Sequence, residues 1–517
     1  MKVKVELTNS QRVFNLSQDQ RDTIKRSLTF DNPQYAQAKR YGRSKYTSIP
    51  PHLYYFKEVS VSNGDGTRSK VLDIPIGVNL SELLNTEIEF KDGRTLNQVN
   101  YPKFNLELRK DQQRAENDYL KCRDKVYTKN LVQLPTGKGK SILALHLAQK
   151  LKQKTLVLVH KDDLVVGWTK DIKLCFGEDI EVGLIKAKKR LVGEQITIAT
   201  VQTLSRMSEE ELSHYTNQFG LVVQDEVHHI GLKIFNIIDK FNSYYKLGLS
   251  ATPTRSDGLD FVFDIFMGGL CHKYVYDPTD TDILKVKVIV KNSKFKYKPF
   301  LHKGMIYNYY DFDPKELPTN PNFLKDIPYK ERPTVPFLTI DNAIVTSREH
   351  KIMVCKDIIN EYRQGHSCIA LFTQKEHINL YYKYLCRYIP KDQIMLYYGD
   401  SKEKSEDMMK KAENKEVLVT LGTYAKATEG TNVKSWEVEF LVSSINNEKN
   451  VEQATGRIRR SKKGKLDPVI VYDYMCKDCY SVSSHINTRL SVYNRLQYDV
   501  IGVPKLNNSI LSIGYNR

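Results

Sequence analysis

The stretch Gln133–Ser141, QLPTGKGKS, lies between an apolar run and a segment of helix-forming residues. A general phosphate-binding loop reads G-x-x-x-x-G-K-[ST], and only Gly139, Lys140 and Ser141 fit it, because Leu134 stands where the leading glycine would be. In such a loop, backbone N–H groups surround the phosphates, the lysine reaches the β- and γ-phosphates, and the hydroxyl binds Mg²⁺. Considered alone, the stretch is either a nucleotide loop or an ordinary glycine turn.

Short apolar runs alternate with amphipathic segments in two long regions around this loop. In the first region we expect strands at 130–134, 155–160, 195–200, 219–223 and 246–249, with a helix at 142–151. In the second we expect strands at 367–372, 416–420, 438–442 and 468–472. Repeated strand, helix and strand predict parallel sheets covered on both faces. The predicted class is therefore α/β.

The same pattern divides the chain into four segments. Residues 1–100 form a separate N-terminal piece, 101–275 and 338–517 hold the two α/β units, and 276–337 read as a linker and insertion. Within the last segment, residues 285–298 alternate like exposed strands, and the prolines after them favour irregular loop.

Composition indicates a soluble globular protein with a polyanionic partner. Lys plus Arg number 79 against 61 Asp plus Glu, a net charge of +18, and such an excess favours nucleic acid because it releases counterions from phosphates. No segment is long and apolar enough to span a membrane, and the N-terminus lacks the apolar core of a secretory signal, so we expect an intracellular protein without membrane attachment. Cys476 and Cys479 lack the second pair that a zinc site needs, so we expect structural thiols.

A second motif, FGLVVQDEVHH at 219–229, places two acids at the end of an apolar run. Asp225 can hold Mg²⁺, and Glu226 can orient and deprotonate the attacking water. Two acids often cap a strand by chance. Their position at the end of a later strand of the α/β region that holds the phosphate loop favours catalysis.

Three more segments complete a set: LRKDQ at 108–112, SATPTR at 250–255 and QATGRIRR at 453–460. Together with the loop and the DEVH sequence, they resemble the ordered motifs of superfamily 2 helicases and translocases, whose loops often begin Pro-Thr-Gly without the leading glycine. The resemblance covers residues 108 to about 475. It implies two tandem RecA-like parallel-sheet domains, with a small α+β domain before them, and an enzyme that hydrolyses ATP with Mg²⁺.

The resemblance assigns roles residue by residue. The predicted catalytic residues are Lys140, Asp225, Glu226 and the arginine fingers Arg457 and Arg460. The predicted nucleotide-binding residues are Arg109, Gln112, Pro135, Thr136, Gly137, Lys138, Gly139, Lys140, Ser141, Asp225, Gly430 and Asn432; Ser141 and Asp225 would bind Mg²⁺, and Gln112 could read an adenine edge. The residues predicted to couple ATP hydrolysis to nucleic-acid binding are His228, Ser250, Thr252 and Gln453. The residues predicted to contact the phosphodiester backbone of the nucleic acid are His160, Lys161, Thr200, Gln202, Thr203, Thr373, Gln374 and Thr423.

The N-terminal piece resembles the corresponding module of phage UvsW-type helicases, through residues 28–35, 39–43, 49–51, 53–56 and 74–77. Residues 21–45 hold seven basic residues against two acids, which suits phosphate contact, although a solvated helix face explains them equally well. The resemblance implies a DNA helicase or translocase that remodels branched DNA by fork regression, branch migration or recombination. An RNA helicase, or a duplex translocase that does not separate strands, stays as the alternative.

The resemblance also sets expectations for partners and location. The expected partner is branched DNA or a junction, with recombination or replication proteins beside it. We expect a monomer or weak oligomer, in the cytoplasm of an infected bacterium if a phage encodes the chain.

Overall fold

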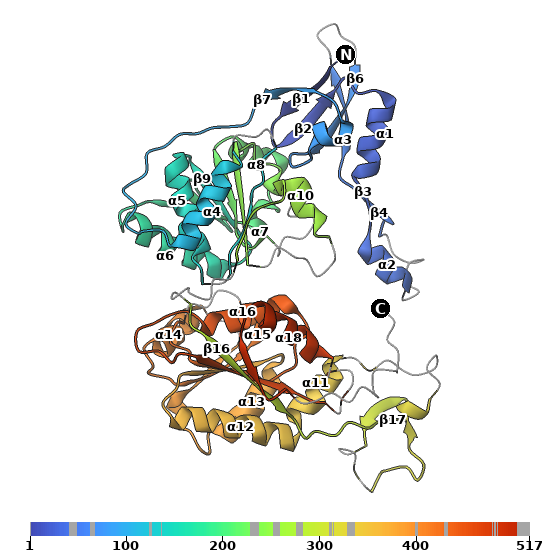
Figure 1. The fold of residues 1–517 in the computed structure, drawn as a ribbon, viewed down its shortest axis with the longest axis vertical. Coiled ribbons are helices and arrows are strands. Elements are labelled where there is room, and N and C mark those ends of the chain that lie inside the picture. The colour runs from blue at the N-terminus through green and yellow to red at the C-terminus, as the bar shows by residue number, and fades with distance from the viewer. Residues whose placement is uncertain are drawn as a thin grey trace. The chain divides into compact units, whose positions relative to one another are not determined.

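The computed structural model describes residues 2–40, 49–62, 68–123, 127–135, 137–227, 237–251, 259–275, 283–309, 313, 315–327, 335, 337–398, 402–428, 433–477, 479, 482 and 484–503. The chain forms two compact units, Met1–Val275 and Tyr276–Arg517 (Figure 1). Within the described ranges, no helix is long and apolar enough to cross a membrane.

The first unit is built around a sheet in which all neighbouring strands run parallel except the edge pair β10 and β11. Its order is β11 (Lys189–Leu191), β10 (Val182–Lys186), β12 (Ile196–Thr200), β9 (Thr155–Val159), β13 (Leu221–Gln224), β14 (Tyr245–Ser250), β8 (Leu131–Gln133) and β15 (Leu270–Lys273). The five strands predicted in this region are all present. Every residue of β9 and β12 is buried, as expected for strands covered on both faces.

Helices cover both faces of this sheet. One core packs α4 (Lys110–Lys121), α5 (Lys140–Leu151) and α6 (Asp162–Phe176) on the strands. The other core contains α7 (Val201–Leu204), α8 (Glu209–Thr216) and α10 (Phe261–Met267). The helix predicted after the phosphate loop is α5.

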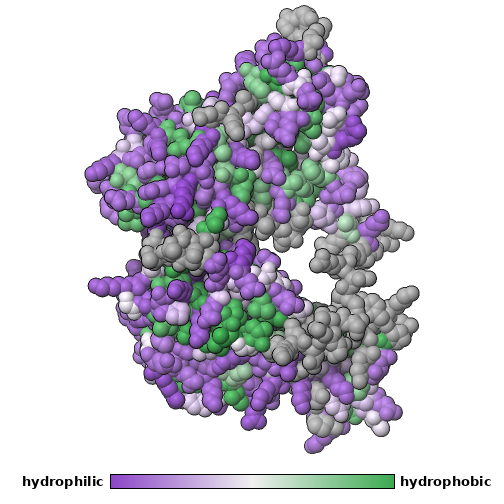
Figure 2. Space-filling view, in the orientation of Figure 1, coloured by the Kyte–Doolittle hydropathy of each residue, from purple (hydrophilic) through white to green (hydrophobic). Residues whose placement is uncertain are grey.

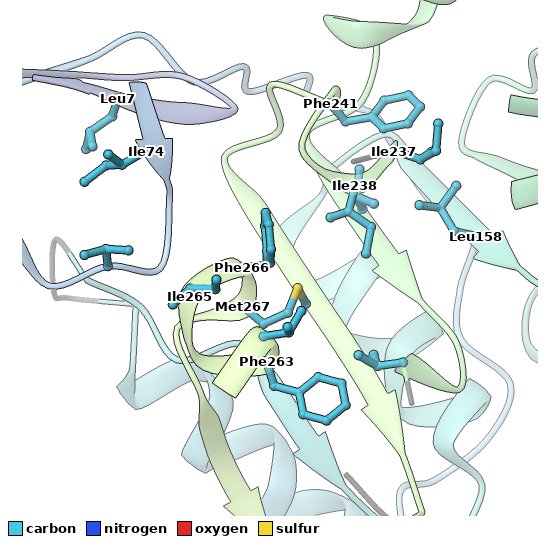
Figure 3. Close-up of a cluster of buried hydrophobic side chains, with 14 of the residues drawn as sticks. Leu7, Ile74, Leu158, Ile237, Ile238, Phe241, Phe263, Ile265, Phe266 and Met267 are labelled. Carbon is cyan, nitrogen blue, oxygen red and sulfur yellow. The ribbon is translucent and has the colours of Figure 1, made fainter. Parts of the chain in front are cut away.

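The N-terminal piece is a mixed sheet that packs on α10. Its order is β5 (Lys57–Ser62), β6 (Arg68–Pro75), β2 (Ser10–Phe14), β1 (Val3–Leu7) and β7 (Ile88–Asp92), with α1 (Gln18–Ser27) and α3 (Leu80–Leu84) beside it; a hairpin of β3 (Thr29–Asp31) and β4 (His52–Tyr54) and helix α2 (Pro33–Arg40) complete it. Figure 3 shows Leu7 and Ile74 of this sheet in the same apolar cluster as Ile265 and Phe266 of α10. The piece therefore shares a core with the first parallel sheet.

Gly77 explains how closely the two parts approach. Its N–H donates to the Ile265 carbonyl at 2.9 Å, and a Cβ at this position would lie 2.4 Å from the Asp264 carbonyl oxygen. Only glycine lets the backbone contact α10 at this distance.

The second unit contains a sheet whose neighbouring strands are all parallel. Its order is β21 (Ile394–Tyr397), β22 (Val419–Thr423), β20 (Cys368–Phe372), β23 (Val438–Leu441), β24 (Val469–Met475), β16 (Val286–Asn292) and β25 (Asp499–Ile501). The four strands predicted here are present. The fold is thus two tandem parallel-sheet α/β domains with a small mixed module at the N-terminus.

Helices lie on both sides of the second sheet (Figure 1). One side has α11 (Phe337–Thr346), α12 (Arg348–Arg363) and α13 (Lys375–Leu385); the other has α15 (Tyr424–Thr428), α16 (Glu448–Ile458) and α18 (His485–Arg495), and α14 (Lys402–Glu413) follows β21. Figure 2 shows mainly hydrophilic residues on the outer surface of the α12 and α13 layer. Residues 380–385 belong to α13, and Tyr381 in this run is part of the core.

One segment differs from its prediction. Residues 286–292, expected in the linker and insertion as an exposed strand, form β16 inside the second sheet, between β24 and β25. Val286, Val288 and Val290 are buried, so the alternation reflects one covered face. The short sheet of β17 (Pro299–His302), β18 (Met305–Asn308) and β19 (Asn322–Phe323) lies in the remainder of that segment.

Candidate nucleotide site and nucleic-acid-binding segments

The phosphate loop connects β8 to α5 in the conformation that its glycines allow. Gly137 and Gly139 have φ values of +87° and +67°, and Gly139 is the residue before the first turn of α5. Lys140 and Ser141 open the helix, where the N-terminal dipole favours anions. The N–H of Leu134 donates to the Ser250 carbonyl at 3.0 Å, which fixes the start of the loop on β14. The buried Leu134 takes the place of a leading glycine without disturbing this path.

Helix α4 fixes the phosphate loop through hydrogen bonds to the loop carbonyls. Gln112, buried in α4, donates from Nε2 to the carbonyls of Lys138 and Gly139 at 3.1 and 3.0 Å, and its Oε1 accepts from the Arg109 N–H at 2.8 Å. A Cβ at Gly139 would lie 2.5 Å from Gln112 Nε2, so the residue must be glycine here. Both amide protons of Gln112 are engaged by the loop, and its Oε1 keeps a second lone pair, so contact with an adenine stays a prediction. Its observed contacts are with the loop.

Lys138 also differs from a simple phosphate ligand. Its side chain is fully buried, with Nζ 3.1 Å from Asp111 Oδ2 and 5.4 Å from the Tyr274 ring centroid. Its backbone N–H donates to the Pro135 carbonyl at 3.2 Å, so this group is also engaged within the loop. Arg109 reaches the loop too, donating to the Gly137 carbonyl at 3.3 Å.

The two predicted acids lie just past the end of β13. Lys140 Nζ is 3.4 Å from Glu226 Oε1, and the Glu226 N–H donates to Asp225 Oδ1 at 2.9 Å. Burial, and secondarily the neighbouring Glu226, raise the pKa of Asp225 to about 6, against the opposing effects of Lys140 and Trp168. Glu226 has a φ of +47°, an uncommon conformation for a residue other than glycine, and such strain clusters at functional sites. The structure therefore brings Lys140, Asp225 and Glu226 together.

Three residues that the sequence motifs do not include contact the site: Trp168 and Gln224 bind Asp225, and Asp171 binds Ser141. Trp168 Nε1 donates to Asp225 Oδ2 at 2.8 Å, and Asp171 accepts a hydrogen bond from the Ser141 hydroxyl. Gln224 donates to the Asp225 carbonyl at 2.9 Å and holds the turn. A buried tryptophan and an acid three residues apart on one helix face were the available signal, because buried polar groups need partners.

The other predicted residues of this unit lie along the same edge of the sheet. The carboxyl ends of β12, β9, β13, β14 and β8 are neighbours, and they deliver in turn Thr200, His160, Asp225, Ser250 and the phosphate loop. Ligands of open parallel sheets bind at this edge. Three more predicted contacts follow β9 and β12 directly: Lys161, Gln202 and Thr203.

One contact connects the segments after β9 and β12, and a second holds the segment after β12 together. Gln202 donates to the His160 carbonyl, and the Thr200 and Thr203 hydroxyls are 2.7 Å apart. The predicted nucleic-acid-binding residues thus occupy the β12 and β9 end of the edge, and the predicted nucleotide-binding residues occupy the β13, β14 and β8 end.

In the second unit, the three predicted nucleic-acid-binding residues lie at the ends of paired strands. Thr423 ends β22, and Thr373 and Gln374 follow β20 before α13. Thr373 donates its hydroxyl proton to Asp341 Oδ2 at 2.8 Å and its N–H to Ser443 Oγ at 3.1 Å. Its donors are therefore committed inside the protein.

The predicted finger helix, α16, carries Gln453 and Arg457 in buried positions, and Arg460 follows its end. Arg457 lies near the buried Glu439 of β23: burial raises the pKa of Glu439 to about 8, and the positive charge of Arg457 acts in the opposite direction. The resemblance made no prediction for Glu439.

Comparisons with known proteins find a restriction-enzyme family model, helicases and a translocase. A family model described as the type III restriction enzyme res subunit matches residues 105–255, which include the loop and both acids. The probable helicase D10 of Escherichia phage T5 is 27% identical over 403 residues, covering 77% of this chain and 78% of that protein. The DNA 3'-5' translocase XPB2 of Sulfurisphaera tokodaii is 25% identical over 401 residues, covering 73% and 84%.

These matches support a helicase of superfamily 2. The chain is an ATP-dependent enzyme of the helicase type. Its fold is shared with a fragment of a putative HsdR subunit of a type I restriction enzyme from Vibrio vulnificus YJ016, with a TM-score of 0.52, 16% identity, and coverage of 77% of this chain and 68% of that chain.

Some predicted residues of the superfamily 2 enzyme lie outside the described residues: Thr136, His228, Thr252, Gly430 and Asn432. Within the part of the chain that the structure describes, no group of three or more His, Cys, Asp or Glu could hold a metal ion. Mg²⁺ commonly takes one or two protein oxygens and completes its shell with phosphates and water, so Ser141 and Asp225 fit the donor chemistry it needs.

Proposed function

We propose that this enzyme couples ATP hydrolysis, with Mg²⁺ present, to movement along DNA and thereby remodels branched DNA. The observation that carries the motor part is the shared edge: one row of strand ends delivers both the hydrolytic residues and the backbone-binding segments of the first unit. A change at either end of that row can be transmitted through the strands to the other.

The proposed division of labour follows the geometry. Lys140 and the loop N–H groups hold the phosphates, Ser141 and Asp225 hold Mg²⁺, and Glu226 orients the water and accepts its proton. Bound Mg²⁺ neutralises charge on the β- and γ-phosphates. The motif match gives Arg457 and Arg460 the role of arginine fingers, whose positive charge stabilises the negative charge of the transition state. Hydrolysis would then depend on a conformational change that brings these arginines to the phosphates.

Asp225 supports this role electrostatically. Its raised pKa means that burial disfavours the carboxylate, and a divalent cation restores the charged form.

Three observations support DNA as the track. The net charge is +18, the N-terminal module resembles that of phage helicases of branched DNA, and the relative XPB2 is named a DNA translocase. In the module, Arg21 and Lys25 lie on α1, where Arg21 donates to the Lys70 carbonyl. Contacts between basic side chains and phosphates do not distinguish bases, so we expect the enzyme to recognise the shape of a junction and not its sequence.

The test is ATP-dependent unwinding and ATPase activity on a panel of DNA forks, four-way junctions, plain duplex and structured RNA. We expect ATPase to rise sharply with DNA, and forks or junctions to be processed fastest. Equal ATPase rates with and without nucleic acid would contradict the motor. Preference for RNA would refute the DNA assignment and leave the motor intact.

A second candidate is translocation along duplex DNA without strand separation. The family model describes a restriction-enzyme subunit, and XPB2 is named a translocase. Displacement of a protein roadblock from plain duplex, with no single strands released from forks, would favour this candidate over unwinding.

A further inference from the structure

Helix α6 contacts both residues that we propose as Mg²⁺ ligands. Trp168 Nε1 donates to Asp225 Oδ2 at 2.8 Å, and Asp171 accepts the Ser141 hydroxyl proton. Trp168 and Asp171 are three residues apart, so one face of the helix carries both. The central part of α6 lies outside every motif that the superfamily resemblance uses.

The chemistry of these contacts suits ligand positioning. A serine hydroxyl has one proton and two lone pairs, so donation to Asp171 leaves the lone pairs for a cation. Asp225 is fixed through both oxygens, by the indole N–H on Oδ2 and the Glu226 N–H on Oδ1. Partners of this kind orient metal ligands, and their loss typically weakens metal binding by about 10- to 100-fold.

The first turn of α6 lies at the other functional segment. The helix starts directly after His160, and Lys161 is its N-cap. Gln202 donates to the His160 carbonyl and so joins the segment after β12. At 1.5 Å per residue, Lys161 and Trp168 are about 10 Å apart along the helix. Because α6 is a continuous helix, a displacement of its first turn at Lys161 would also displace Trp168 in its middle.

We propose that Trp168 and Asp171 are positioning residues that hold Asp225 and Ser141 for Mg²⁺ and transmit nucleic-acid binding at His160 and Lys161 to them. This rests on the proposed function of Ser141, Asp225 and the segment after β9. A purely structural role competes with it, because Trp168 is only 3% exposed and belongs to the core between α6 and the sheet. The two roles differ in their consequences for Mg²⁺.

The first measurement is the affinity for a fluorescent ADP analogue, in Mg²⁺ and in EDTA. The variants are Trp168→Phe, which removes the indole N–H, and Asp171→Asn, with Asp179→Asn as a control in the exposed turn after α6. We expect the Mg²⁺-dependent gain in affinity to fall about tenfold in both variants, with the EDTA affinity and the control unchanged. An equal Mg²⁺-dependent gain in all proteins would overturn the proposal.

The second measurement is the ratio of ATPase activity with and without DNA at saturating Mg²⁺. A general loss of folding lowers both rates and leaves their ratio unchanged, whereas lost transmission lowers the ratio. We expect the ratio to fall severalfold in Trp168→Phe and Asp171→Asn, and Asp171→Glu, which keeps the acceptor, to recover part of it. A ratio equal to that of the wild type in both variants would refute transmission through α6.

A spectroscopic readout is independent of turnover. The chain has two tryptophans, so Trp436→Phe leaves Trp168 as the only indole. We expect its fluorescence to change on addition of Mg²⁺ with ADP and to stay constant with ADP in EDTA. No Mg²⁺-specific change would count against contact between Trp168 and a metal-bound Asp225.

The wild type separates this proposal from the proposed function. If the wild type shows no Mg²⁺-dependent nucleotide affinity and no DNA stimulation, the proposed function fails. If it shows both and the α6 variants behave identically to it, only the role of Trp168 and Asp171 fails.

Discussion

The carboxyl edges of the two parallel sheets carry different kinds of polar residue. In the first unit, a loop with two glycines at positive φ precedes α5, and Lys140 Nζ at the start of that helix lies 3.4 Å from Glu226 Oε1. In the second unit, the corresponding polar groups hydrogen-bond to one another in the interior: Asp341, Thr373, Ser443, Ser444, Asp473 and Arg489. The same architecture therefore carries the proposed binding site at the edge of one sheet and a buried hydrogen-bonded network in the other unit.

The centre of the second network is the ion pair Arg489–Asp473, at 2.8 Å, with both side chains at most 1% exposed. Arg489 also donates to the Ile445 carbonyl at 2.9 Å, and Tyr493 donates to Asp473 at 2.8 Å. Buried charges survive only when paired and hydrogen-bonded in this way. Variants of the first edge should therefore change chemistry, and variants of the second should change stability.

The largest expected effect is on the first edge. Lys140→Ala removes the charge proposed to act on the phosphates, so ATP hydrolysis should fall by about 10³-fold, the scale of a single phosphate-stabilising charge. We expect the thermal midpoint and DNA binding to change little, since the lysine lies at a ligand site. ATPase assays and thermal unfolding check this, and wild-type turnover in the variant would refute the site.

The next effect should appear as stability. Arg489→Met leaves Asp473 charged and buried, and breaking such a pair costs about 3–5 kcal/mol. The double variant Arg489→Met with Asp473→Leu should recover much of this loss, because an apolar pair of similar volume is often neutral. Chemical denaturation of both variants measures it. A single variant as stable as the wild type would show that the network is not the stabilising feature we describe.

Much of the fold follows from local sequence pattern. β9, β12 and β13 appear as apolar runs because strands buried on both faces need no alternation, and the loop and α5 follow from glycines and helix-forming residues. β16 was misassigned because its partner β24 begins at Val469, far along the chain, and a one-sided alternation resembles an exposed strand. Strand pairing over such a distance leaves no local signal.

The site shows the same limit. Lys140, Asp225 and Glu226 were predicted as site residues because each belongs to a contiguous motif, and the structure places them close together. The contacts of Trp168 and Asp171 join segments that no motif spans. Gln112 shows that a motif predicts position better than partner, because its amide binds loop carbonyls.

A smaller effect should depend on pH. Burial raises the pKa of Glu439 from an ordinary 4.5 to about 8, so the folded state keeps a proton that the unfolded state loses across this window. Stability should therefore fall as pH rises from 5 toward 8, and Glu439→Gln should remove that dependence. The free energy of unfolding of the variant minus that of the wild type should increase by about 2 kcal/mol from pH 6 to pH 8. Denaturation at both pH values checks this, and parallel pH profiles would contradict the buried, protonated carboxyl.

The smallest effect concerns Thr373, which is both a predicted nucleic-acid contact and a member of the buried hydrogen-bonded network. Its hydroxyl proton goes to Asp341 and its N–H to Ser443, so neither donor is left for a phosphate oxygen. Thr373→Val should cost about 1 kcal/mol through the lost hydrogen bond to Asp341. DNA affinity, measured by fluorescence anisotropy on the folded variant, should change less than about twofold, since lost donors weaken DNA only if they contact it. Thr373→Ser, which keeps the hydroxyl, is the matched control. A large loss of DNA affinity in Thr373→Val alone would mean that the hydroxyl leaves Asp341 for the DNA backbone, and that the second edge opens when the track binds.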